Sequence, residues 1–196
     1  GKLVARRREC APQRVGQPAR RLLLAGAQGS QLFEFALVLP LLLVIVIGIM
    51  DFGGAFNLKQ KLNNAAREGA RFAASQSTLD LTGSTQPPPS IVAIHDVVQN
   101  YLTGANLTQC AINGGPTQSG LTWTYTSSSA GCGSFSLVIE RGFTFLNGTT
   151  TVQATRVMLT YPYTWTFGRI IGLLVQGASP TLPATISSDA VMQNMS

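Results

Sequence analysis

The sequence predicts an α+β fold. A long amino-terminal helix crosses a membrane, continues as a soluble helix and precedes a small antiparallel sheet. Residues 35–50 form an apolar run without a charge, and residues 57–76 repeat apolar side chains at helical spacing. Three later segments alternate apolar and polar residues, which is typical of strands. We therefore expect four parts: a leader (1–29), a membrane helix (30–56), its helical extension (57–77) and an α+β head domain (78–196).

The leader carries the whole net charge of the protein. It holds seven basic residues and one acid, whereas residues 30–196 hold seven of each. A basic flank marks the cytoplasmic side of a membrane span. The aromatic residues that accompany basic ones in nucleic-acid-binding proteins are missing from the leader. We predict a cytoplasmic amino terminus, a head on the other side of the membrane, no nucleic-acid partner, and no fixed structure for residues 1–28, which are rich in Ala, Gly and Pro.

Three residues of the predicted membrane helix are unusual there. Pro40 removes one helix hydrogen bond and favours a kink, which membrane helices tolerate. Asp51 is expected near the far interface, where a carboxylate costs much less than at the midplane. Glu34 lies at the entrance of the apolar run. Because a charge in hydrocarbon is costly, an acid within a span indicates a functional site.

Beyond the span, the helix extension has one side of small residues. Ala66, Gly69, Ala70 and Ala73 would allow another helix or a sheet to approach closely. The plainer interpretation is an amphipathic helix that lies on its own domain, and the two are compatible.

The head is predicted to begin with a break and a short helix. The break, residues 78–90, contains three consecutive prolines, which cannot continue a helix. Ser90 is expected to cap a helix over residues 91–102. Strands are predicted at residues 121–126, 135–139, 150–163 and 182–192. The apolar stretch 170–175 is too short for a second span.

Cys110 and Cys132 both follow the span, in the compartment where disulfides persist. We predict a bridge between them, with two separate buried thiols as the alternative. In the chain-entropy model such a bridge contributes about 3 kcal/mol.

The sequence offers no candidate catalytic set. His95 is the only histidine, and no cluster of Cys, His and Asp accompanies it. Neither a phosphate-binding glycine loop nor a nucleophile elbow is present. We predict a protein that is not an enzyme and uses no metal or cofactor.

The leader, Gly29 and Glu34 together form a recognisable signal. A basic leader, a glycine, a glutamate five residues later and an apolar run that starts at Phe35 resemble the class III signal of type IV prepilins. That resemblance implies that prepilin peptidase cuts in the cytoplasm between Gly29 and Ser30. Ser30 then becomes the new amino terminus. A plain signal anchor would explain the leader and the span but not Glu34.

Longer stretches resemble the TadE-like proteins of the tight-adherence (Tad/Flp) pilus. Residues 34–43, 48–53 and 65–73 carry the resemblance. Residues 157–163 and 182–192 are similar more weakly. The proline-containing loop at residues 80–90 and the long leader depart from the family. The resemblance implies a minor pilin or pseudopilin of the bacterial inner membrane, or of the pilus itself. A protein of this kind would act in the assembly of an adhesion pilus, together with other pilins and the inner-membrane assembly platform.

The resemblance also gives Glu34 and Phe35 a role in subunit pairing. The new amine at Ser30 of one subunit would pair with Glu34 of a neighbour in the lipid, so that homo- or hetero-oligomers form through the amino-terminal helix. Two alternatives stay open. Glu34 would cap the amino end of its helix, or the chain would be an unprocessed, signal-anchored binding or adhesion module.

Overall fold

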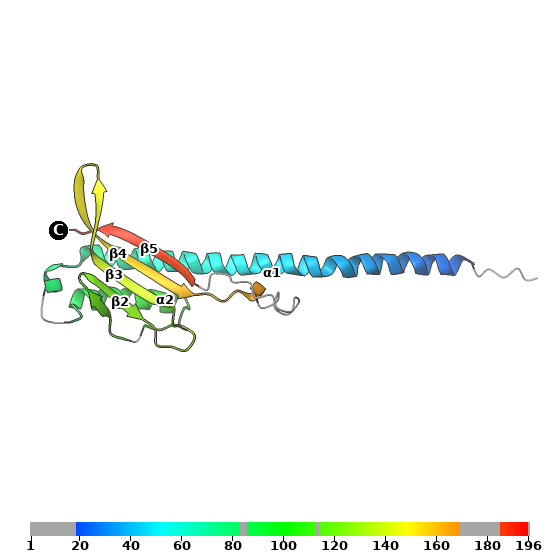
Figure 1. Cartoon of the computed structure of the whole chain (residues 1–196), viewed down its shortest axis with the longest axis horizontal. Coiled ribbons are helices and arrows are strands. Elements are labelled where there is room, and N and C mark those ends of the chain that lie inside the picture. Colours follow the sequence, from blue (N-terminus) through cyan, green and yellow to red (C-terminus); the bar gives the residue numbers. More distant parts are fainter. Residues whose placement is uncertain (1–18, 83–85, 113, 169–184, 196) are drawn as a thin grey trace, which may run out of the picture. The chain divides into compact units, whose positions relative to one another are not determined.

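The computed structural model describes residues 19–82, 86–112, 114–168 and 185–195. These residues divide into two compact units, of which the first ends at Ile45 and the second begins at Val46. The elements, labelled in Figure 1, are α1 (Ala19–Ser75), the 3-10 helix η1 (Leu79–Thr82), α2 (Pro89–Gly104), β1 (Thr117–Ser119), β2 (Thr122–Thr126), β3 (Ser136–Asn147), β4 (Thr150–Pro162) and β5 (Thr185–Gln193).

Helix α1 begins ten residues before Gly29, at Ala19. The prediction of no fixed structure is therefore wrong for residues 19–28. That segment, ARRLLLAGAQ, consists mostly of strong helix formers, whose propensity outweighs the cost of its single glycine. The helix also continues through Pro40.

The five strands form one antiparallel sheet in the order β1-β2-β3-β4-β5, so each strand pairs with its neighbour in the chain. The predicted α+β class is confirmed. Strand β1, which has only three exposed residues, was not predicted, and β3 runs eight residues beyond the predicted end at residue 139. The predicted stretch 170–175 and the predicted start of the last strand, residues 182–184, lie outside the described residues.

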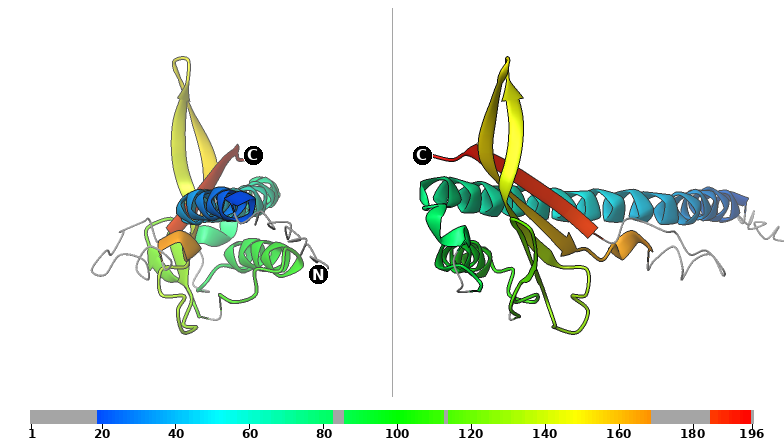
Figure 2. Two further views of the ribbon diagram at one scale, coloured as in Figure 1. Left: turned by 90° about the vertical axis from the view of Figure 1, so that its right-hand side faces the viewer. Right: turned by 60° about the vertical axis from the view of Figure 1, so that its left-hand side comes forward.

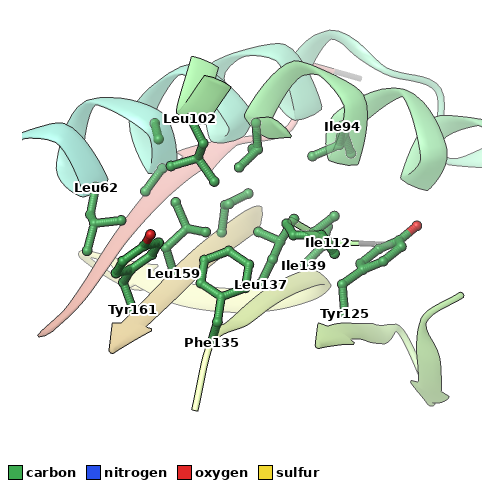
Figure 3. Close-up of a cluster of buried hydrophobic side chains, with 14 of the residues drawn as sticks. Leu62, Ile94, Leu102, Ile112, Tyr125, Phe135, Leu137, Ile139, Leu159 and Tyr161 are labelled. Carbon is green, nitrogen blue, oxygen red and sulfur yellow. The ribbon is translucent and has the colours of Figure 1, made fainter. Parts of the chain in front are cut away.

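The core lies between the sheet and the two helices. Figure 3 shows Leu62 of α1 and Ile94 and Leu102 of α2 facing Leu137 of β3 and Leu159 of β4. All five side chains are at most 1% exposed. Burying each such side chain contributes about 1.5–3 kcal/mol relative to leaving it exposed. Packing of this core therefore holds the helices against one face of the sheet.

Charged side chains satisfy the two helix ends that meet at the break. The guanidinium of Arg141, which is buried, donates to the carbonyls of Ala73, Gln76 and Ser77 at the carboxyl end of α1. A cation is favourable there because the last carbonyls of a helix lack partners. Burial lowers the pKa of Arg141, and the Asp80 carboxylate partly opposes this.

The predicted capping role of Ser90 is wrong. Helix α2 begins at Pro89 with Pro88 as its N-cap residue. A proline fits the first helical turn because its missing N–H has no partner to lose there. The acceptor at this end is Asp80 of η1, which takes hydrogen bonds from the backbone N–H and the hydroxyl of Ser90 at 2.8 and 3.0 Å.

Strands β3 and β4 continue past the part of the sheet that the helices cover. After an irregularity between Glu140 and Phe143, residues 143–147 pair only with residues 150–154. This hairpin, which we call the arm (residues 143–154), projects beyond the rest of the sheet in Figures 1 and 2. It closes at Gly148, whose φ of 66° suits glycine. Residues 144–151 of the arm are exposed, including Leu146 at 72%.

Candidate functional site

The residues predicted for processing and pairing all lie on α1, in the first unit. Gly29 is exposed, and a Cβ atom added there would meet no atom within 4 Å. Ser30 follows it in the helix. Glu34 is exposed, and Phe35 is exposed at 62%. A glycine and an acid thus lie five residues apart on an exposed stretch of helix, and a larger side chain at Gly29 would meet no neighbouring atom.

The alternative in which Glu34 caps its helix is not met in the uncut chain. Helical residues 19–33 precede Glu34, whereas a carboxylate interacts favourably with a helix amino end only within the first turn. That alternative would apply only to a chain cut at Gly29.

The surface of α1 around these residues is apolar. Between Gln31 and Met50 no residue is buried. Exposed side chains include Leu32 and Phe33, both at 70%, and Leu41 at 63%. Within the described part of the chain, α1 is the one helix long and apolar enough to cross a membrane. No described part of the protein covers this apolar surface, which is typical of a helix that lies in a nonpolar environment.

From Gln31 onward, Asp51 is the first buried residue of α1. Burial then recurs at Ala55, Leu58 and Leu62, so the helix face that packs on the head begins at Asp51. Its carboxylate accepts a hydrogen bond from the backbone N–H of Phe167 at 2.5 Å, and its carbonyl accepts one from the hydroxyl of Tyr163 at 2.9 Å. Asp51 therefore fastens the segment after β4 (residues 163–168) to α1, a function that its sequence position did not indicate.

Neighbouring groups fit this attachment closely. A Cβ added at Gly54 would lie 2.8 Å from the Tyr163 hydroxyl oxygen, so a larger residue there would require the Tyr163 side chain to shift. Burial, and secondarily the negative charge of Asp51, raises the pKa of Tyr163. The rings of Tyr163 and Trp165 meet edge to face at 4.9 Å, and those of Trp165 and Phe52 at 5.7 Å. These aromatic residues were not identified from the sequence, although Tyr163, Trp165 and Phe167 alternate there as a visible signal.

The small residues of the helix extension lie inside the head. Ala66, Gly69, Ala70 and Ala73 are buried, and the three alanines are fully so. A Cβ at Gly69 would lie 2.5 Å from a methyl group of Val98 in α2. The close approach that these residues permit is therefore made by the protein's own second helix.

The predicted disulfide is present. Cys110 and Cys132 are bonded, with their Cα atoms 5.5 Å apart, and both are buried. The bridge joins the loop after α2 to the loop before β3. The carbonyl of Cys132 accepts the backbone N–H of Phe135 at 2.8 Å, so the bridge also holds the entry to β3.

We find no reactive constellation in the part of the chain that the structure describes. No three His, Cys, Asp or Glu side chains there gather in a way that could hold a metal ion. His95 stacks on Tyr125 with ring centroids 4.5 Å apart, and its Nδ1 lies 2.9 Å from a carboxylate oxygen of Asp96. This is a packed histidine beside an exposed acid.

An exposed apolar helix that leads into an α+β head defines a single-pass membrane protein. The comparison with protein families then narrows the class: the family described as TadE-like protein matches residues 29–71. The match confirms the predicted resemblance over that stretch. Neither the search of curated proteins nor the search of solved structures found a match.

Proposed function

We propose that this protein is a minor pilin or pseudopilin that acts in assembly of a Tad/Flp-type adhesion pilus, after prepilin peptidase has removed residues 1–29. The observation that carries the proposal is the position of the family match. It begins at Gly29, the residue after which the cut is proposed, and extends through the apolar helix to residue 71. The TadE-like family is a structural, pilus-associated kind of protein.

The charge distribution supports an orientation with the leader in the cytoplasm. All of the net charge precedes Ser30, and basic residues beside a span stay on the cytoplasmic side. The Cys110–Cys132 bridge suits a head on the other side, since disulfides persist in oxidising compartments. Cleavage in the cytoplasm would thus remove the basic leader and leave the anchor and the head.

The cut supplies a cation at the depth where Glu34 places an anion. We propose that the amine of Ser30 in one subunit pairs with the Glu34 carboxylate of its neighbour when the helices pack side by side. Whatever Glu34 contacts within its own chain, a carboxylate in hydrocarbon favours a nearby cation. Removing one partner of a buried ion pair costs about 3–5 kcal/mol. Glu34 would therefore fix the register between subunits.

The cut is tested by substituting two glycines of the leader. Gly29→Leu should leave the full-length chain on a denaturing gel, whereas the control Gly26→Leu should give the same mature product as the unchanged protein. Mass spectrometry of that product should find Ser30 at its amino terminus. An unchanged product size for Gly29→Leu, or a working pilus containing only uncut chain, would refute processing and favour the unprocessed adhesion module.

Pairing is tested separately, with two acids of the same helix. Glu34→Ala should still be cut at Gly29, because the peptidase acts on a single chain, but it should fail to co-purify with pilus components. Glu68→Ala, which removes an exposed acid from the head portion of α1, should assemble normally. Normal assembly of cut Glu34→Ala would rule out the pairing and leave the cleavage proposal intact.

A further inference from the structure

The apolar surface of α1 does not end where the head begins. Ile49, Phe52 and Phe56 are 68%, 70% and 68% exposed and belong to the same compact unit as the head. Their spacing of three and four residues places them on one side of the helix, while Asp51 and Ala55 lie on the buried side. Two phenylalanines are therefore exposed beside the first residues that pack on the head.

A second aromatic group from the other end of the chain meets these phenylalanines. The segment after β4 brings Trp165 against Phe52 and Tyr163 against Trp165. Figure 1 shows this segment, in orange, beside α1 past the end of the sheet. Residues 163–168 carry no charge. The hydrogen bonds from Tyr163 and Phe167 to Asp51 hold the segment in this position.

We propose that Phe52, Phe56, Tyr163 and Trp165 form a membrane-contact surface that rests in the headgroup layer of the bilayer. We call this surface the aromatic seat. Tyrosine and tryptophan concentrate at membrane interfaces because each combines an apolar ring with a polar O–H or N–H group. The hydroxyl of Tyr163 is satisfied by the Asp51 carbonyl. The occupant is lipid because the seat continues directly from the apolar surface of the membrane helix.

The dimensions agree with this assignment. Phe56 lies four positions after Phe52 in the helix, which is a rise of about 6 Å. The interfacial layer on each side of the hydrocarbon core is about 5–8 Å thick. Asp51 lies at the same level but is buried against the head, where a hydrogen bond from the backbone N–H of Phe167 stabilises its carboxylate away from lipid. The seat thus sets how deep the helix enters the membrane and how close the head lies to its surface.

The protein contains two tryptophans, of which Trp123 is fully buried in the head core. The full chain is placed in lipid nanodiscs at one copy per disc, with spin-labelled lipids that carry the quencher either near the headgroup or deep in the acyl chain. We expect the shallow label to quench tryptophan fluorescence more than the deep label. This quenching should be lost in Trp165→Phe, because the remaining tryptophan lies inside the head.

Two neighbouring glycines provide matched variants. Gly54→Val should displace the Tyr163 side chain and weaken quenching by the shallow label, because a Cβ there meets the Tyr163 hydroxyl. Gly53→Val should leave the quenching unchanged, since nothing lies within 4 Å of its added Cβ. Displacing the end of one flexible side chain leaves the core of the head in place.

Two results would overturn the proposal. One is that neither lipid label quenches Trp165 while aqueous iodide does, which would place the seat in water. The other is that Trp165 becomes shielded only with several copies per disc, which would assign the surface to a second copy of the chain. Neither result depends on a cut at Gly29, so the proposed processing is tested independently.

Discussion

At the scale of single residues, Gly69 fixes the distance between the two helices. We expect Gly69→Val to lower the free energy of unfolding by about 2 kcal/mol or more, because overpacking a filled core typically costs 1–3 kcal/mol. The added atoms would meet the fully buried Val98, which is β-branched and cannot turn aside within its helix. Chemical unfolding in detergent, followed by the near-ultraviolet signal of Trp123, measures the change.

Gly53→Val is the control for this prediction. It makes the same substitution in the same helix, at a position where nothing lies within 4 Å. Its free energy of unfolding should stay close to that of the unchanged protein. Equal losses in the two variants would show that helix propensity, and not packing on α2, decides the effect.

Tyr125 makes the stability of the head depend on alkaline pH. Burial, and secondarily the Asp96 carboxylate, raises the pKa of Tyr125 from 10.0 to about 12. The folded state holds the proton more tightly, so this stabilisation is complete below pH 10 and is lost as the pH rises through 12. At pH 11 we expect the titration of Tyr125 to have lowered the free energy of unfolding by about 1.4 kcal/mol.

Urea unfolding at several pH values between 8 and 11 measures that dependence. In Tyr125→Phe the free energy of unfolding should fall less between pH 8 and pH 11, by the same amount, because the titrating group is gone. The buried Tyr161, whose pKa burial also raises, should keep a residual slope in the variant. An identical slope in both proteins would contradict the assignment to Tyr125.

Ser90 and Asp51 show what the sequence could not reveal about single residues. A serine after prolines fits the composition of a helix cap, but the acceptor that satisfies this end, Asp80, lies ten residues earlier. Asp51 interrupts an apolar run and was therefore placed at the membrane interface. Its partners, Tyr163 and Phe167, come from more than a hundred residues later. A local sequence pattern does not reveal contacts between residues that lie so far apart in the chain.

At the scale of elements, the disulfide links two loops that have no regular structure of their own. We expect the double variant Cys110→Ser/Cys132→Ser to lose about 3 kcal/mol of unfolding free energy, since the bridge closes a loop with a sequence separation of 22. Thermal or chemical unfolding measures this loss. Cys10→Ser, in the leader, is the control and should change nothing.

A reductant adds an independent readout for the bridge. It should destabilise the unchanged protein and the Cys10→Ser variant but have no effect on the double serine variant. Equal sensitivity of all three proteins to the reductant would show that its action lies elsewhere in the chain.

Elements with strong periodicity were predicted well. Helix α2 and strands β2, β3 and β4 lie where alternation or helical spacing indicated them. The errors have physical causes. Strand β1 has three exposed residues and so lacks an apolar pattern. Strand β3 continues through a register shift after Glu140, which breaks the two-residue alternation on which the prediction depended.

At the scale of the whole molecule, the head core that the described residues form begins at Leu58. We therefore expect a fragment that begins at Val46 to fold without the first unit and to keep the near-ultraviolet signal of Trp123 in mild detergent. A fragment that begins at Ala66 lacks Leu58, Leu62 and Ala65. This shorter fragment should unfold at a lower denaturant concentration, because losing one buried leucine side chain alone costs about 2–5 kcal/mol. Similar midpoints for the two fragments would be inconsistent with this core.

The candidate site was only partly accessible to sequence reasoning. The anchor, the glycine and the acid are local features of one apolar helix, and the family match covers the same stretch. The aromatic seat combines residues on α1 with residues after β4. It exists only because the meander from β1 to β4 returns the chain to the helix, and that return depends on the packing of the head as a whole.

The arm has a consequence for how the head responds to its surroundings. From Gly142 to Thr155 the sequence contains no ionisable side chain. Coulomb attraction is what salt screens, so any contact made through the arm should hold equally in dilute and concentrated buffer and across mildly acidic and basic media. Pairing through Glu34 in lipid depends on charge but is shielded from dissolved salt, because buried ion pairs are screened much less than exposed ones. Substitution, and not ionic strength, would therefore tell the two contacts apart.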